Sequence, residues 1–95
     1  MEAKQAYEEK TKAQLKQLNA RMEVLRAKAE EAKADAKIEY AERLEKLERR
    51  QEEAEARLNE LRGSGRQAWR ELRDGVDNAV TEFERSLTQA LSQFE

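Results

Sequence analysis

The chain of 95 residues contains no cysteine, no histidine and no proline, and it has only three glycines. Without cysteine and histidine, the chain has no disulfide, no thiol nucleophile, no imidazole base and almost none of the usual zinc ligands. Without proline, no helix is forced to kink or end. These absences exclude most kinds of catalytic site and leave long helices unobstructed.

Long apolar runs are also missing. The chain contains no stretch of about 18 apolar residues, which is the length that a membrane-spanning helix needs. The first residues, Met1–Gln5, lack the apolar core of a secretion signal. The net charge is −2, and acidic and basic residues are mixed in every third of the chain, which argues against binding to a phosphate backbone. We therefore expect a cytoplasmic protein with no affinity for nucleic acid and little for a membrane surface.

The sequence is rich in charged residues, and its apolar residues recur with the period of a helix. Charged residues make up 42% of the chain, a composition typical of long helices and coiled coils when it is combined with a regular apolar stripe. From Leu15 to Ala36 the apolar positions alternate steps of three and four, which is a heptad pattern. The alternation slips before Leu44 and then resumes, with Gln51 as a polar interruption. This pattern predicts one long helix over residues 1–62.

Opposite charges lie one turn apart along the outer face of this helix. The pairs with the favourable order and spacing are Glu8–Lys12, Glu39–Arg43, Glu42–Lys46, Glu45–Arg49 and Glu53–Arg57. Each such pair stabilises a helix by roughly 0.2–0.5 kcal/mol. We interpret this face as solvated and not as a binding site.

The segment 63–65, Gly-Ser-Gly, interrupts the helical pattern. Gly63 suits the left-handed position that often follows a helix, and Ser64 and Gln67 have the spacing of a capping box for a second helix over 66–95. A link this short favours reversal into an antiparallel helical hairpin. The alternative is a gentle kink in one continuous rod.

The second helix carries an apolar stripe with an eleven-residue repeat. When it is folded back on the first helix, Trp69 comes near Leu61, and Phe94 reaches the alanines at 32 and 36. Trp69 could be a binding anchor, but its place on the stripe favours a core position. The expected hairpin core comprises Leu44, Leu47, Leu58, Leu61, Trp69, Leu72, Val76, Val80, Phe83, Leu87, Leu91 and Phe94.

The second helix is about half as long as the first, so residues 1–31 have no partner in the hairpin. This arm nevertheless carries an apolar face formed by Tyr7, Leu15, Leu18, Met22 and Leu25. We therefore expect an antiparallel homodimer in which these residues form the contact between copies. The competing outcome is a monomer whose arm frays or folds back, without proline or glycine to help it turn.

Three segments, Ala27–Tyr40, Gly63–Leu72 and Gly75–Asp77, carry a resemblance to a known group. Together they resemble a group of small, uncharacterised bacterial coiled-coil proteins of similar length, over a span from about Tyr7 to Val80. The resemblance implies a bacterial, cytoplasmic, helical protein. It brings no activity, cofactor or catalytic residue.

The sequence therefore predicts an all-α, one-domain protein that is not an enzyme and binds no metal or cofactor. Adjacent glutamates such as Glu8 and Glu9 point apart on a helix and cannot act as an acid–base pair, and the Gly-Ser-Gly segment lacks the lysine of a phosphate-binding loop. We expect a structural or protein-interaction module. The alternative is reversible lipid binding by the helix over 66–95, although its polar face carries acidic as well as basic residues.

Overall fold

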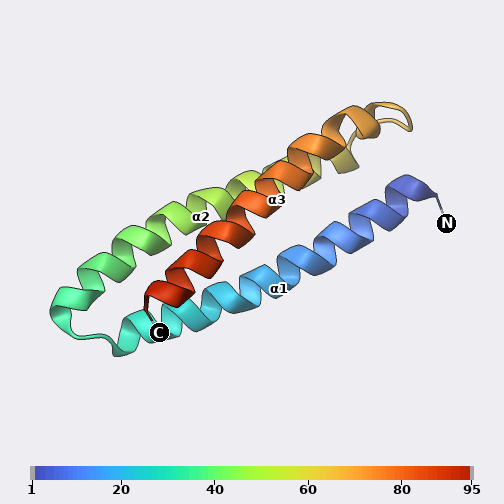
Figure 1. The fold of residues 1–95 in the computed structure, drawn as a ribbon. Coiled ribbons are helices and arrows are strands. Elements are labelled where there is room, and N and C mark those ends of the chain that lie inside the picture. The colour runs from blue at the N-terminus through green and yellow to red at the C-terminus, as the bar shows by residue number, and fades with distance from the viewer. Residues whose placement is uncertain (1, 95) are drawn as a thin grey trace.

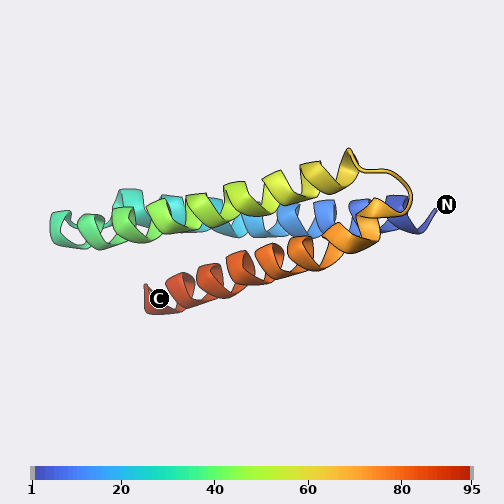
Figure 2. The same cartoon turned by 90° about the horizontal axis from the view of Figure 1, so that it is seen from above.

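The chain forms an all-helical bundle of three helices (Figure 1). The computed structural model describes residues 2–94 and contains α1 (Ala3–Glu31), α2 (Ala34–Arg62) and α3 (Ala68–Gln93). Successive helices run in opposite directions, so that α1 and α3 point the same way and α2 runs against both (Figure 1). The bundle measures 50 × 19 × 17 Å, and Figure 2 shows α2 and α3 side by side with α1 partly behind them.

The expectation of one helix over residues 1–62 is wrong, because the chain reverses after α1. Ala32 and Lys33 have extended backbone angles, with φ, ψ of −73°, 154° and −71°, 159°. The amide of Ala32 donates a hydrogen bond to the carbonyl oxygen of Ala29 at 3.3 Å, which closes the last turn of α1. The reversal thus occurs at two residues that have no special conformational freedom.

Burial explains why two good helix formers leave the helix. Interrupting a helix leaves up to about four carbonyl groups without helical partners, at about 0.5–1.5 kcal/mol each. The reversal buries four large side chains of α1 against the other helices, each worth about 1.5–3 kcal/mol. These side chains are all at most 5% exposed: Leu15, Leu18, Met22 and Leu25. The burial of the α1 face therefore outweighs the local preference for a continuous helix.

The same four residues were expected to contact a second copy. In the bundle they lie in the core of a single chain, and Tyr7 packs against that core as well. The argument for a homodimer depended on an uncovered arm, and the arm is covered by α2 and α3. The arm folds back within one chain, so its apolar face no longer argues for a second copy.

The α2–α3 link reverses the chain by a different mechanism from the expected one. No residue among 2–94 has a positive φ, and Gly63 itself has φ −80°. The hydroxyl of Ser64 donates back to the carbonyl oxygen of Leu61 at 2.5 Å, and α3 begins only after Gln67, whose side chain makes no cap. The expected capping box is therefore wrong.

Lys4 of α1 satisfies the exposed carbonyl groups at this link. Its ammonium group donates to the carbonyl oxygens of Arg62, at 3.1 Å, and Ser64, at 2.7 Å. A cation at the carboxyl end of a helix also complements the helix dipole. The start of α1 is thereby attached to the end of α2, which a hairpin without α1 would not allow.

The residues expected in the hairpin core form one cluster between the helices. Buried members are Leu47, Leu58, Leu61, Trp69, Val76, Val80, Phe83 and Leu87, and half-buried members are Leu44, Leu72, Leu91 and Phe94. The rings of Tyr40 and Phe94 stack with centroids 3.9 Å apart. Phe94 also lies with Ala32 and Ala36 in one surface pocket, as expected, whereas Leu91 was the expected neighbour of Tyr40.

Candidate interaction surfaces

The polar chemistry of the chain lies almost entirely on its surface. Among residues 2–94, Thr11 is the only buried polar residue, and no buried side-chain nitrogen or oxygen lacks a hydrogen-bond partner. The same residues include no group of acidic side chains placed to hold a metal ion. None of the helices described here is long and apolar enough to cross a membrane. Candidate sites are therefore grooves between helices.

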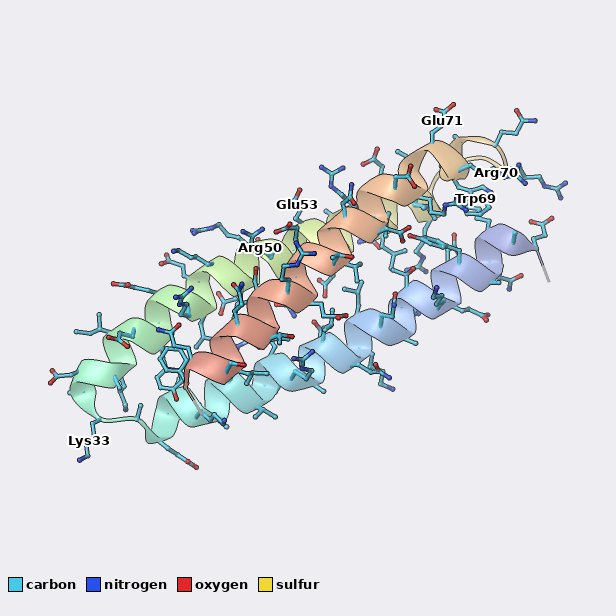
Figure 3. The ribbon with its side chains drawn as sticks, viewed as in Figure 1. Lys33, Arg50, Glu53, Trp69, Arg70 and Glu71 are labelled. Atoms are coloured by element: carbon cyan, nitrogen blue, oxygen red, sulfur yellow. The ribbon has the colours of Figure 1, made fainter. Side chains whose placement is uncertain are left out.

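One cluster joins the start of α1 to the start of α3. The rings of Tyr7 and Trp69 lie 5.9 Å apart, and the guanidinium groups of Arg70 and Arg73 each lie 5.9 Å from the Trp69 ring. Trp69 is only 6% exposed and points towards α1 in Figure 3. It therefore closes the core at this end of the bundle, as its place on the apolar stripe indicates.

The hydroxyl group of Tyr7 donates a hydrogen bond to Oδ1 of Asp77 and lies 3.3 Å from the carbonyl oxygen of Arg73. Partial burial, followed by this bond to the Asp77 carboxylate, raises the pKa of Tyr7 far above its usual value near 10. Both causes favour the neutral phenol. Tyr7 of α1 thus contacts α3 of the same chain.

A groove of about 700 Å³ runs between α1 and α2. Leu15 and Leu58 form its apolar floor, and its walls include Lys12, Lys16 and Glu55. Beside it, the side-chain amide of Gln51 donates to Asn19 Oδ1 at 2.6 Å. The polar interruption in the heptad therefore has a partner on α1, which fixes the register of the two helices.

Two smaller pockets lie between α2 and α3. Arg50, Arg57, Glu53 and Glu82 line one of them, and Arg43, Lys46 and Arg50 of α2 line the other with Ser86 and Gln89 of α3. Figure 3 shows Arg50 and Glu53 on α2, next to the ribbon of α3. Glu39, Glu42 and Glu45 stand one turn before Arg43, Lys46 and Arg49 on α2, so this face of the helix carries both signs of charge.

Arg50 joins α2 to α3 through an ion pair with Glu82, at 3.2 Å. Arg57 pairs with Glu53 at 3.3 Å and extends over Gly75. Opposite Arg43 and Lys46, α3 contributes the neutral polar side chains Ser86 and Gln89. Arg50 and Arg57 are therefore both held in ion pairs, one across to α3 and one within α2.

The sequence could not reveal these contacts, because the spacing gave Arg43, Lys46 and Arg57 a partner on α2 and gave Arg50 none. Of the five expected pairs, only Glu53–Arg57 forms in the described part of the chain. Ion pairs across helices form instead, as between Arg26 of α1 and Glu48 of α2 at 3.4 Å. The positions of these cations relative to α3 depend on the tertiary fold and carry no mark in the sequence.

Comparison of the chain with protein-family models, curated proteins and solved structures finds no match. The resemblance to small bacterial coiled-coil proteins therefore stays a prediction.

Proposed function

We propose that the chain is a non-enzymatic protein-interaction module that presents charged grooves on a helical bundle. The observation that carries this proposal is the separation of apolar side chains from ionisable ones. Most of the large apolar residues of α1, α2 and α3 fill one core, whereas ionisable residues line open grooves between the helices. Such a surface can recognise another protein by shape and charge, and it offers no enclosed position where an acid and a base converge on a substrate.

The alternative, lipid binding by α3, has less support. The apolar residues of α3 are used in the core; for example, Trp69 is 6%, Val76 0% and Phe83 0% exposed. The large apolar residues that are exposed, Val24 and Ile38, belong to α1 and α2. Binding of α3 to a lipid surface would therefore require the bundle to open.

Affinity capture from the cells that express the chain, followed by binding of each purified candidate, tests the proposal. We expect a protein that binds the folded chain saturably and with fixed stoichiometry. Co-sedimentation with vesicles of neutral and anionic lipid is the parallel measurement, and we expect the chain to remain in the supernatant. Sedimentation with vesicles, or the absence of any protein that binds saturably, would contradict the proposal that the chain is a protein-interaction module.

A further inference from the structure

The α1–α2 link reverses the chain with a backbone that is close to helical. Ala32 and Lys33 have φ angles of −73° and −71°, near the helical value of about −63°. Only their ψ angles, 154° and 159°, lie far from the helical value of about −42°. Rotation about two ψ bonds would therefore turn the reversal into one uninterrupted helix from α1 to α2, as hinge residues at the ends of helices do in other proteins.

The residues around the link favour that uninterrupted helix. Five of the ten residues 27–36 are alanines, and alanine is the best helix former. The apolar stripe also passes through the link in helical register, because Leu25, Ala29, Ala32 and Ala36 follow one another in steps of four, three and four. A straight helix would give hydrogen-bond partners to the carbonyl groups that lose them where α1 ends.

Contacts of α1 with α2 and α3 hold the link in its reversed form. They include the burial of Leu18 and Leu25 and the hydrogen bond from Arg21 of α1 to Thr88 of α3, at 2.9 Å. None of these contacts requires that the three helices belong to one chain. In a straight chain α1 cannot reach its own α2–α3 pair, but α1 of a second straight copy can make the same contacts there.

The register of the bundle determines how two straight copies would meet. Asn19 of α1 contacts Gln51 of α2, and Arg26 of α1 contacts Glu48 of α2. The sequence positions midway between these partners are 35 and 37. If the same pairs form between two antiparallel straight helices, the copies face each other near Ala36, whose small side chain allows the helices to approach closely.

We propose that the α1–α2 link is a switch between the closed monomer and a domain-swapped dimer, in which two straight copies of this chain exchange α1. Glu31 and Asp35 restrain the switch. In a straight helix they would lie one turn apart, where like charges are unfavourable, whereas in the closed form Asp35 lies in the first turn of α2 and complements the helix dipole. This inference concerns two copies of the chain and does not depend on the proposed function.

The switch depends on protein concentration. A short link holds α1 near its own α2–α3 pair at an effective concentration of the order of 1 mM. We therefore expect the chain to be a monomer at micromolar concentrations and to form the swapped dimer when it is unfolded in urea and refolded at about 1 mM. Because α1 must leave the core before the copies can separate, the dimer should persist after dilution.

Size-exclusion chromatography with light scattering, after refolding at about 1 mM, tests the switch. Asp35→Lys gives Glu31 an opposite charge one turn away in the straight helix, so it should raise the dimerisation constant at least about threefold. Lys33→Pro should abolish the dimer, because proline fits the closed link and interrupts a straight helix. The matched control is Glu84→Lys, the same change of charge at an exposed site on α3, which should stay within about twofold of the wild type.

Nitroxide labels distinguish a swapped dimer from two closed bundles that merely adhere. The chain has no cysteine, so Lys16→Cys with Glu55→Cys provides two unique labelling sites. In the closed form both positions line one groove, whereas in a straight helix they would be about 60 Å apart. Dimers refolded with an excess of unlabelled chain should show the long distance.

Three results would overturn the switch. The first is a dimer that shows only the short distance between the labels, because its copies would then be closed. The second is equal dimerisation of the wild type and Lys33→Pro. The third is a monomer alone after refolding at about 1 mM, for the wild type and for Asp35→Lys.

Discussion

Gly75 lies on α3 beneath the side chain of Arg57, and a Cβ at this position would come within 3.1 Å of Nη1 of that arginine. Glycine inside a helix is less favourable than alanine by about 0.5–1 kcal/mol. Arg57 is a flexible, exposed side chain, so it can move by the few tenths of an ångström required. We therefore expect Gly75→Ala to stabilise the bundle by up to about 1 kcal/mol, measured by urea unfolding.

A double variant provides the control for this substitution. If Arg57 gives way freely, Gly75→Ala should have the same effect with arginine or alanine at position 57. A loss of stability in the presence of Arg57 alone would instead show that the arginine is held rigidly over α3.

The raised pKa of Tyr7 predicts that the stability of the bundle depends on pH. Its pKa is raised in the folded chain by partial burial and by the bond to Asp77, so folding favours the neutral phenol. This contribution is complete below the unfolded pKa, near 10, and is lost as the pH rises from there towards the folded pKa. We expect the stability of the wild type relative to Tyr7→Phe to be constant from pH 7 to 9 and to fall by pH 11.

Urea unfolding of both proteins across this range measures the effect, because the other ionisable groups are common to the two chains. A difference between the two proteins that stays constant up to pH 11 would mean that Tyr7 titrates normally and that its hydroxyl is not held by Asp77.

At the level of single residues, the sequence predicted those positions that follow from the apolar stripe. Trp69 lies in the core, as its position on the stripe indicates, and Gln51 could be recognised as unusual in its heptad. The partner of Gln51, Asn19, could not be found, because it belongs to a contact between α1 and α2 that the expected long helix excludes. The surroundings of Arg43 and Lys46 were hidden for a related reason: these side chains are not paired along α2, as their spacing suggests, but line a pocket beside α3.

At the level of helices, the link at Ala32 and Lys33 gives the sharpest test of the fold. Lys33 has φ −71°, which is the angle that proline imposes, and Ala32 has the extended conformation that a following proline requires. Lys33→Pro should therefore stabilise the three-helix bundle by about 0.4–1 kcal/mol. In a continuous helix the same change would cost about 3 kcal/mol or more.

Thermal unfolding followed by circular dichroism decides between these outcomes. Glu30→Pro, inside the last turn of α1, is the comparison variant and should be strongly destabilising. If Lys33→Pro lowers the stability as much as Glu30→Pro does, α1 and α2 are continuous and the reversal is absent.

The end of α1 could not be predicted because nothing local requires it. The α2–α3 link has two glycines, but the α1–α2 link consists of Ala32 and Lys33, both good helix formers. The remaining local signals are weak: Lys28 in the last turn of α1 and Asp35 in the first turn of α2 have the charges that helix ends favour. The reversal is fixed by the burial of Leu18 and Leu25, which becomes visible only when all three helices are placed together.

At the level of the whole molecule, the bundle predicts that stability does not depend on association. Leu18 is 3% exposed and Leu25 0%, so Leu18→Glu with Leu25→Glu would bury two charges in the core of one chain. Burying unpaired charge is strongly unfavourable, and we expect this double variant to lose its cooperative unfolding transition. A dimer interface at these residues would instead yield folded monomers.

The midpoint of urea unfolding of the wild type provides the second measurement. It should be the same across about a hundredfold range of protein concentration, since a dimer would become more stable as concentration rises. Sedimentation equilibrium should give the mass of one chain, 11.1 kDa. A midpoint that rises with protein concentration would support the homodimer that was expected from the sequence.

The three crossings of the chain also determine how the molecule would bear mechanical load. The start of α1 lies at one end of the 50 Å bundle and the end of α3 lies towards the other (Figure 1). Tension between these two ends would pull α1 and α3 in opposite directions along their axes, so core contacts over the full length of the helices would resist together. Tension between residue 2 and the α2–α3 link, which Lys4 joins at the same end, would peel α1 away one turn at a time. We expect the first geometry to withstand the larger force in an optical trap.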